Sequence, residues 1–476
     1  MLQGFYSATM KTTMERTYIR DIVGKVGEEV TLKGWVDARR DHGKLIFIDI
    51  RDATGLAQIV FAGDNKELWQ IADALRPEWV VEITGIVKNR PENMKNPHLE
   101  TGNVEIEATA LVILSEAKIP PIPLDTDGRE IEEEMRLKYR YLDLRRPRMQ
   151  KNMRLRHKVT SLVREYLNDK DFVEIETPLL TKTSPEGARD FLVPSRKYSG
   201  KFFALPQSPQ QYKQLLMIAG FERYYQIARA LRDEDSRGDR QYEHTQIDME
   251  MSFTTEEEVR NLTEEMMILI AERCGKKILA KPFPVFTHAE AMAKFGADKF
   301  DLRGKDIDPD TLAFAWVVDF PLFEMDEETK RLTFAHNPFS APKPEHVEKL
   351  LAGEDLENLR AQQYDLVCNG YELASGGVRI SNPDVQRKVF EILGLTKEQT
   401  EERFGHIIDA YAYGAPYHAG IAPGLDRLVM ILAGETSIAE VIAFPKTGQA
   451  RDPMMKAPSE VDDNQLKELG IKIIQD

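Results

Sequence analysis

The fold is decided by three stretches: Ala230-Leu-Arg-Asp-Glu-Asp235, then Gln241-Tyr-Glu-His-Thr-Gln-Ile-Asp248, and far downstream Gly424-Leu-Asp-Arg427. An Arg-x-Glu pair on one expected strand is followed by a loop and a polar return strand, and the distant stretch adds a Gly-x-x-Arg. A guanidinium is a planar, permanently charged group that can bond two phosphate oxygens at once. A charge run of this kind alone is usually a solvated surface. The three stretches in this order predict a site for a nucleoside triphosphate.

The composition is that of a globular protein with two or three domains. The chain has 476 residues and a mass of 54.4 kDa, with 42% hydrophobic and 30% charged residues. No apolar run approaches the ~20 residues that a membrane span needs, and the start does not read as a secretion signal. Cys274 and Cys368 cannot form a disulfide framework, and the nine histidines show no zinc spacing. These features predict a cytoplasmic, reduced protein without a membrane partner.

The charge distribution is uneven. A net charge of −15 argues against a non-specific coat on nucleic acid, and no DNA partner is expected. From Arg136 to Lys158, however, there are ten Lys or Arg and one acidic residue, Asp143. A solvated basic surface is one interpretation of this segment. The domains expected on either side favour a hinge that contacts phosphates.

Residues 30–114 indicate a small β-barrel. Apolar residues alternate or run together between Gly, Asp and Pro, in segments expected at 30–36, 45–50, 56–60, 79–85 and 104–108. A short helix is expected at 68–75. Five strands with a helix after the third are the layout of the Greek-key OB-fold, which binds oligonucleotides. A proline-rich linker follows at 119–123.

The rest of the chain predicts an α+β domain. Residues 152–168 have helical periodicity, and 173–178 are expected to form a strand that ends at a proline. Strand-rich and helical segments then mix without a regular βαβ alternation. This pattern predicts a mainly antiparallel sheet flanked by helices.

The ordered motifs of this chain resemble those of a known family, the class II aminoacyl-tRNA synthetases of the bacterial aspartyl type. The resemblance runs from about Tyr18 to the C-terminus. It is carried by Gly34-Trp-Val, Tyr139-Arg-Tyr-Leu-Asp-Leu-Arg-Arg-Pro147, Glu176-Thr-Pro-Leu-Leu-Thr-Lys182, Ser184-Pro-Glu-Gly-Ala-Arg-Asp190, Leu205-Pro-Gln-Ser-Pro-Gln210, Asp319-Phe-Pro-Leu-Phe-Glu324, Tyr371-Glu-Leu and Gly377-Val-Arg379.

The resemblance also implies a domain plan. It has an N-terminal extension at 1–17, an OB-fold anticodon-binding domain at 18–118, a hinge at 119–151, a catalytic domain at 152–446 and a C-terminal extension at 447–476. Members of this type usually carry an inserted domain of about a hundred residues before the third motif. Here the chain passes almost directly through 304–311, so the insertion is missing.

The implied reaction has two steps. Aspartate and ATP give aspartyl-adenylate and pyrophosphate, and the aspartyl group then passes to the 3′ end of tRNA. Such chemistry depends on positioning and charge neutralisation and needs no covalent nucleophile. By resemblance, the catalytic residues are Arg232, Glu372 and Arg427. The implied ATP-binding residues are Arg232, Asp233, Glu234, Gln241, His244, Glu372, Gly424, Leu425, Asp426 and Arg427.

Two details of the nucleotide site follow. The family usually has Phe at the second adenine-stacking position, where this chain has His244, so stacking with a possible pH dependence is expected. Asp365 and Glu372 are the implied ligands of Mg²⁺, which takes one or two carboxylates together with phosphates and water.

Binding of aspartate requires cations for its side-chain carboxylate. The residues that the resemblance implies are Glu186, Ser208, Gln210, Lys213, Arg232, Asp248, His336 and Arg379. Lys213 and Arg379 match the family's cation pair, and Glu186 lies in a loop expected to close over the substrate. Asn337 stands where the family often has a second histidine.

The barrel is expected to read the anticodon. Single-stranded RNA is bound by stacking bases on aromatic rings and bonding their edges. The implied contacts are Arg40, His42, Phe47 and Gln58, although Phe47 could instead be an inward core residue. His42 is typical of enzymes that charge both tRNA-Asp and tRNA-Asn, whereas strictly tRNA-Asp-specific ones tend to have Leu.

Other interpretations remain at this stage. An asparaginyl- or lysyl-tRNA synthetase would share the fold, but the Lys213 and Arg379 pair argues against both. A tRNA-independent amino-acid ligase, a regulatory paralogue and a simple RNA-binding module are less consistent with the complete set of motifs. Glu176-Thr-Pro178 resembles the motif that builds a two-fold interface, so a homodimer is expected.

Overall fold

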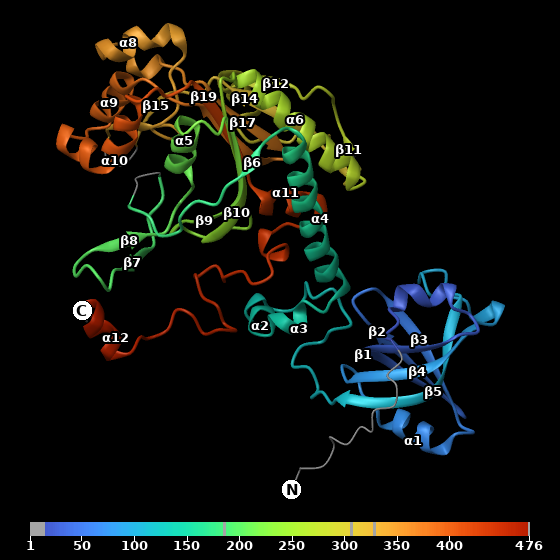
Figure 1. Ribbon diagram of the computed structural model, residues 1–476. Helices are drawn as coiled ribbons and strands as arrows, with labels where there is room; N and C mark the ends of the chain where they lie inside the picture. Colours follow the sequence, from blue (N-terminus) through green and yellow to red (C-terminus); the bar gives the residue numbers. More distant parts are fainter. Residues whose placement is uncertain (1–14, 184–186, 305–307, 327–329, 475–476) are drawn as a thin grey trace. The chain divides into compact units, whose positions relative to one another are not determined.

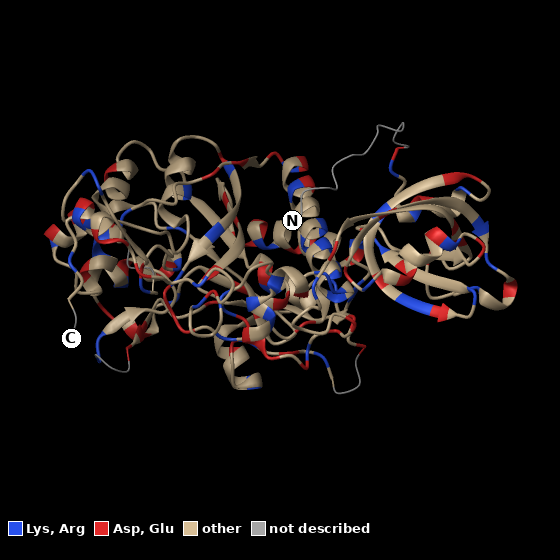
Figure 2. Ribbon diagram, turned by 90° about the horizontal axis from the view of Figure 1, so that it is seen from below, with Lys and Arg blue, Asp and Glu red and all other residues tan. Residues whose placement is uncertain are grey.

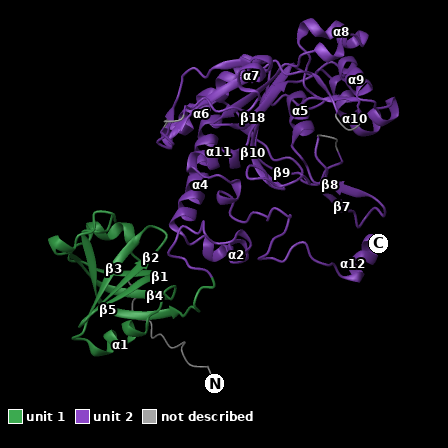
Figure 3. Ribbon diagram, turned by 180° about the vertical axis from the view of Figure 1, so that it is seen from behind, with its two compact units in different colours: residues 1–121 green, residues 122–476 purple. Residues whose placement is uncertain are grey.

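The computed structural model describes residues 15–183, 187–304, 308–326 and 330–474. The chain divides into two compact units, Met1–Pro121 and Ile122–Asp476 (Figure 3). Acidic and basic residues are interspersed over both units (Figure 2). Within the described ranges, no helix has the length and apolar character needed to cross a bilayer.

The first unit is a closed five-stranded barrel with the strand order β1-β2-β3-β5-β4 (Figure 1). Its elements are β1 (Glu29–His42), β2 (Leu45–Arg51), β3 (Leu56–Ala62), α1 (Lys66–Ala74), β4 (Val80–Asn89) and β5 (Val104–Ser115). Ile46, Ile48 and Ile50 of β2 are fully buried, so the alternate residues Phe47 and Asp49 face outward. The predicted OB-fold is confirmed, including the helix after the third strand.

The second unit is built on an eight-stranded sheet with the order β12-β14-β17-β18-β19-β10-β9-β6. Only the outer pairs β12–β14 and β6–β9 are parallel, which confirms the predicted, mainly antiparallel sheet. The strands are β6 (Val173–Glu174), β9 (Arg223–Leu231), β10 (Glu243–Ser252), β12 (Val285–Thr287), β14 (Phe314–Val318), β17 (Gln363–Cys368), β18 (Tyr371–Val378) and β19 (His418–Pro423).

Helices flank this sheet (Figure 1). The helices of the unit, not all of which touch the sheet, are α2 (Glu133–Lys138), α3 (Arg140–Asp143), α4 (Pro147–Asp169), α5 (Gln210–Ile218), α6 (Glu256–Arg273), α7 (His288–Phe295), α8 (Val347–Ala352), α9 (Pro383–Ile392), α10 (Lys397–Tyr411), α11 (Leu425–Ala433) and α12 (Asp463–Leu469). Apolar residues of α4, α6 and α11 form one buried cluster with residues of β10, β14, β17 and β19. This cluster is the core beneath the central strands.

Short two-stranded sheets complete the unit. They are β7 (Leu192–Pro194) with β8 (Phe202–Ala204), β11 (Lys277–Ile278) with β13 (Thr311–Leu312), and β15 (Phe323–Met325) with β16 (Leu332–Phe334). Part of the 304–311 junction, residues 305–307, lies outside the described residues.

The basic segment between the domains belongs to the second unit. The Asp143 carboxylate is fully buried and accepts hydrogen bonds from Arg136 at 3.0 Å and from Arg146 at 2.7 Å. Arg136 also bonds Glu440 at 2.8 Å, and Glu435 accepts from a further arginine of α4. For these buried arginines the prediction of a phosphate-contacting hinge is wrong, because their charges are satisfied inside the protein.

Candidate active site

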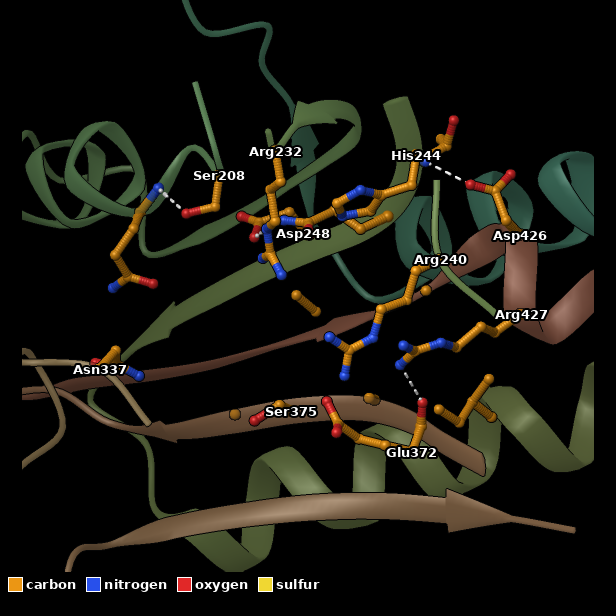
Figure 4. Close-up of a pocket in the computed structure, with 18 of the residues that line it drawn as sticks. Ser208, Arg232, Arg240, His244, Asp248, Asn337, Glu372, Ser375, Asp426 and Arg427 are labelled. Atoms are coloured by element: carbon orange, nitrogen blue, oxygen red, sulfur yellow. Dashed lines mark hydrogen bonds between the residues drawn. The ribbon is translucent and has the colours of Figure 1, made fainter. Parts of the chain in front are cut away.

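A pocket opens on the sheet face opposite the apolar core (Figure 4). Strand β10 explains this arrangement, because its residues alternate between the two faces. Ile247 and Met249 belong to the core cluster, whereas Gln246 and Asp248 line the pocket. The remaining walls come mainly from the start of α5, the loop before β10, the 336–339 segment, β18 and the start of α11.

Most of the predicted ATP and aspartate contacts meet in this pocket. They are Ser208, Gln210, Lys213, Arg232, Glu234, Gln241, His244, Asp248, His336, Glu372, Arg379, Gly424, Asp426 and Arg427.

Four predicted contacts are not among the lining residues. Leu425 is 1% exposed within the apolar core, because α11 turns this side chain toward the sheet. The backbone of Asp233 forms a β-bridge with that of Arg189, and the neighbouring residues Arg232 and Glu234 line the pocket instead. Asp365 lies behind the lining residue Ser375 and accepts a hydrogen bond from its hydroxyl group. Glu186 lies outside the described residues.

Four buried charges form the floor of the pocket. Lys213 Nζ lies 2.9 Å from Asp248 Oδ2 and 3.3 Å from Glu250 Oε2. Arg379 donates to both oxygens of Glu250, at 2.9 and 3.1 Å. Gly420, opposite Glu250 on β19, leaves the space for this carboxylate, since a Cβ there would overlap it. The two predicted cations are therefore held rigidly, each against a carboxylate.

The electrostatics of the two carboxylates differ. Burial raises the pKa of Asp248 above its ordinary value, with Lys213 opposing that shift. Burial acts in the same direction on Glu250, but Arg379 and Lys213 outweigh it and hold the pKa of Glu250 at about 2. Glu250 is thus a permanent anion, whereas Asp248 depends on a cation nearby for its charge.

Several buried polar atoms that face the pocket have no hydrogen-bond partner among the described residues. These atoms are Asp248 Oδ1, Gln210 Nε2 and Arg232 Nε. Buried polar groups are normally paired, so each such atom indicates a position that a ligand fills. An acceptor and two donors in one pocket suit a ligand with both a cationic and an anionic group.

Arg427 stands at the opposite end of the pocket. Its guanidinium donates to the carbonyl oxygen of Glu372 at 2.7 Å (Figure 4) and lies 3.0 Å from the Asp239 carboxylate. The adjacent Asp426 accepts from the backbone N–H of Thr245 at 2.7 Å and also from Arg156 of α4. The Asp426 side chain therefore fixes the first turn of α11 to β10 and α4, which positions Arg427.

His244 is half-buried on β10. Burial, together with the charges of Arg232 and Arg427, lowers the pKa of His244 to about 3. The imidazole is consequently neutral at physiological pH, so the expected pH dependence of stacking does not arise in this range. Gln241 is buried nearby and accepts a hydrogen bond from the backbone of Lys446 at 3.1 Å.

The carboxylates of Asp365 and Glu372 repel each other across the β17–β18 hairpin. Burial, and then the charge of Glu372, raises the pKa of Asp365 well above its ordinary value. A divalent cation would remove this repulsion, and two carboxylates suit Mg²⁺ when phosphates and water complete its shell. Ser375 links Asp365, at 2.5 Å, to His336, at 2.7 Å. No cluster of three or more potential metal ligands occurs within the described part of the chain.

The outer face of the barrel carries the predicted anticodon contacts. Arg40 donates to both oxygens of Asp49, at 2.5 and 2.8 Å, and to Gln58 at 3.3 Å. The rings of His42 and Phe47 meet edge to face with centroids 5.6 Å apart. All four predicted residues lie on the β1–β2–β3 surface, and the alternative of Phe47 as a core residue is excluded by its outward position.

Some pocket residues were not predicted from the sequence. They are the lining residues Asp239, Arg240, Thr245, Gln246 and Ser375, together with Glu250 of the floor, which pairs with Lys213 but does not itself line the pocket. The signal for Glu250 was present, because Gln246, Asp248 and Glu250 alternate with apolar residues along one strand. Asn337, which stands where the family often has a second histidine, lines the pocket and accepts a hydrogen bond from the Phe339 backbone at 2.9 Å, which stabilises its own turn.

The two units and the pocket together define a class II aminoacyl-tRNA synthetase: an OB-fold barrel joined to a catalytic domain on an antiparallel sheet. The comparisons agree with this definition. The chain belongs to the family described as "tRNA synthetases class II (D, K and N)", which matches residues 132–448, and an "OB-fold nucleic acid binding domain" matches residues 30–114.

The curated relatives are bacterial. The chain is 44% identical to the "Aspartate--tRNA(Asp/Asn) ligase" of Rubrobacter xylanophilus, covering 94% of this chain and 95% of that protein. It is 41% identical to the protein of the same name from Bacillus subtilis (96% and 98%) and 40% identical to the "Aspartate--tRNA ligase" of Staphylococcus saprophyticus (94% and 97%). The first of these alignments spans 572 positions, more than the 476 residues of this chain, so that relative contains segments without a counterpart here.

Solved structures share the fold. Asparaginyl-tRNA synthetase from Pyrococcus horikoshii, complexed with asparaginyl-adenylate, has a TM-score of 0.74 at 23% identity, covering 91% of this chain and 99% of that one. Aspartyl-tRNA synthetase from Entamoeba histolytica has a TM-score of 0.74 at 21% identity, covering 94% of each chain. At this identity the likeness establishes the architecture alone.

Proposed function

We propose that this protein is an aspartate–tRNA ligase. It activates L-aspartate with ATP and transfers the aspartyl group to the 3′ end of tRNA-Asp. The names of its bacterial relatives support this function. The observation that carries the choice of amino acid is the buried floor, where Lys213 and Arg379 lie beside the unpartnered Oδ1 of Asp248.

The floor accounts for each charged group of the amino acid. Asp248 Oδ1 accepts a hydrogen bond from the α-ammonium. Lys213 and Arg379 receive the side-chain carboxylate, and Arg232 Nε is directed at the α-carboxylate and the α-phosphate. A lysine substrate would place a third cation beside two buried cations, which is strongly unfavourable.

The first step needs positioning more than acid–base chemistry. A carboxylate oxygen of aspartate attacks the α-phosphorus, a new P–O bond forms, and the bond to the β-phosphate breaks to release pyrophosphate. Arg232 and Arg427 neutralise the charge that these two anions bring together. Glu372 and Asp365 would hold Mg²⁺, which would supply further charge neutralisation at the phosphates. Neutral His244 stacks on the adenine.

Transfer to tRNA uses the barrel to select the tRNA. Phe47 provides a stacking surface for an anticodon base, and Arg40 and Gln58 bond base edges. We extend the proposal to tRNA-Asn as a second substrate, because His42 packs against Phe47 and several relatives carry the name of a ligase for both tRNAs.

The proposed protein acts as a cytoplasmic homodimer. The interface would follow the Glu176-Thr-Pro178 segment. Hydrophobic side chains are exposed around it, with Val173, Leu179 and Leu180 each between 44% and 52% accessible. Apolar side chains that gather on one surface are typical of a protein interface. Sedimentation equilibrium at micromolar concentration should give twice the chain mass, and a fully active monomer would contradict this part of the proposal.

Pyrophosphate exchange tests the activation step. ATP–pyrophosphate exchange should depend on aspartate and should be weak with asparagine or lysine. Arg427→Ala should abolish exchange, because phosphate neutralisation and adenine contact are lost together. Arg387→Ala is a matched control, since this exposed arginine of α9 pairs only with Asp384 at 3.8 Å among the described residues. Near-normal exchange by Arg427→Ala would refute the assignment.

Aminoacylation of purified tRNA-Asp and tRNA-Asn tests the second substrate. The two anticodons differ at the third base, and relaxing that discrimination takes only about 1–3 kcal/mol. Comparable kcat/KM for the two tRNAs is expected, and His42→Leu should lower the value for tRNA-Asn alone. A preference for tRNA-Asp above about a hundredfold would rule out the second substrate and leave the first intact.

A further inference from the structure

Lys299 lies in the segment that follows α7, at a point where the chain is firmly anchored. The carbonyl oxygen of the next residue, Phe300, accepts from the backbone N–H of Gly370 at 3.1 Å, which joins this segment to the β17–β18 turn. Phe300 is 6% exposed, and its ring stacks on that of Phe295 with centroids 4.0 Å apart. The backbone that carries Lys299 is therefore fixed beside the pocket wall formed by β18.

The Lys299 side chain contacts Glu372, a residue that lines the pocket. Its Nζ lies 2.7 Å from Glu372 Oε2, and the two side chains are 37% and 24% exposed. Arg427 bonds the carbonyl oxygen of the same glutamate. Lys299 and Arg427 thus bring two positive charges to Glu372. The Lys299 charge also contributes to lowering the pKa of His336.

Glu372 is the only described residue that pairs with the Lys299 ammonium. Glu372 is also the carboxylate proposed above to hold Mg²⁺, and a carboxylate that ligates a metal is a poorer partner for an ammonium group. Lys299 would then need another anion within its reach. The proposed function would bring the phosphates of ATP close to Glu372, and an ammonium is a strong point charge for phosphate oxygens.

We propose that Lys299 binds the β- and γ-phosphates of ATP, and afterwards the pyrophosphate product, after exchanging its ion pair with Glu372 for one with phosphate. This inference rests on the proposed function. It assigns Lys299 a contact with the leaving group, whereas Arg232 contacts the α-phosphate. A purely structural ion pair, in contrast, would only stabilise the turn between β17 and β18.

The affinities for ATP, pyrophosphate and AMP distinguish these two roles. AMP keeps the adenine and the α-phosphate but lacks the groups assigned to Lys299. For Lys299→Met we expect a loss of about tenfold in affinity for Mg²⁺-ATP and for pyrophosphate, with AMP affinity within about twofold of the wild type. Isothermal titration calorimetry on the full-length protein measures all three.

The control is Lys294→Met, on the adjacent helix α7. This lysine lies over the rings of Phe286 and Phe295, neither of which lines the pocket, whereas Lys299 pairs with the lining residue Glu372. It should leave all three affinities unchanged. Lys299→Arg retains the positive charge, so its ratio of ATP affinity to AMP affinity should lie within about threefold of the wild-type ratio. This variant is used in place of Lys299→Met if the Met variant fails to fold.

The outcomes are separable. Equal losses for ATP and AMP, or no loss for either, would overturn the role of Lys299 while leaving the proposed function intact. A wild-type protein that binds neither nucleotide would overturn the proposed function itself.

Discussion

Glu250→Gln is the substitution that best tests the charge arrangement of the pocket floor. The change keeps the shape of the side chain but removes its negative charge. In the wild type, Glu250 is fully buried, accepts two hydrogen bonds from Arg379 and lies 3.3 Å from Lys213. In the variant, one acceptor oxygen becomes an NH₂ group that faces a guanidinium donor, and Asp248 alone must balance two buried cations.

The expected loss of stability follows from this geometry. Removing one partner of a buried ion pair costs about 3–5 kcal/mol, because the remaining charge stays away from water. Glutamine still offers one acceptor, so we expect about 3 kcal/mol, at the lower end of this range. Since Arg379 and Lys213 hold the Glu250 pKa at about 2 against an ordinary 4.5, the stabilisation is fully present above pH 4.5 and is lost as pH falls toward 2.

Urea unfolding followed by circular dichroism measures this loss at pH 7.5. The matched control is Glu243→Gln on the same strand, a half-exposed carboxylate paired with Arg229 and with Lys446, which should cost less than about 1 kcal/mol. If Glu250→Gln cost no more than this control, Glu250 would not be the essential counter-ion of the floor. The reasoning on aspartate recognition would then have to be abandoned.

Three further predictions concern other parts of the protein. As the pH falls from 7.5 to 5.5, His244→Phe should become more stable relative to the wild type, by at most about 1.4 kcal/mol per pH unit. The reason is that His244 of the unfolded wild type binds a proton below about pH 6.5, whereas in the folded protein its pKa of about 3 keeps it neutral. Urea unfolding of both proteins at the two pH values measures this difference. Arg156→Met should weaken ATP and AMP binding alike, by about tenfold in calorimetry, because Asp426 loses the cation that helps to fix the first turn of α11; unchanged AMP binding would contradict this role. Phe47→Leu should raise the KM for tRNA by about tenfold through lost stacking but leave pyrophosphate exchange intact, and a defect in exchange would show that the residue acts elsewhere.

The barrel was predictable from local pattern because its interior imposes a period of two. The strand starts agree within one residue, but β1 runs to His42 where the apolar pattern predicted an end at Val36. The extra residues are polar and continue the pairing with β2 as far as Leu45. A polar outer surface has no apolar alternation, so the strand that forms it cannot be recognised by that signal.

Long-range partners explain what the sequence could not show. The basic segment 136–158 appeared available to phosphates because its neighbours in sequence are nearly all basic. Its counter-ions Glu435 and Glu440 lie almost three hundred residues downstream and reach it only through the packing of α11 and the chain that follows. The same limit applied to Lys299, whose partner Glu372 is brought to it by the sheet. Motifs identify which side chains carry the chemistry, and tertiary packing decides which of them are already neutralised.

That neutralisation indicates how an acidic protein selects anionic ligands. Five of the cations proposed to bind ligands each contact a carboxylate: Lys213 with Asp248, Arg379 with Glu250, Arg427 with Asp239, Lys299 with Glu372 and Arg40 with Asp49. Leaving these cations unpaired would cost stability where they are buried. A ligand must therefore offer its own negative charge at the right place to compete with the resident carboxylate, and a neutral amide such as that of asparagine cannot do so as well. Selectivity then comes from the exchange of one anion for another, and the net charge of −15 adds a general repulsion that only a well-placed anion overcomes.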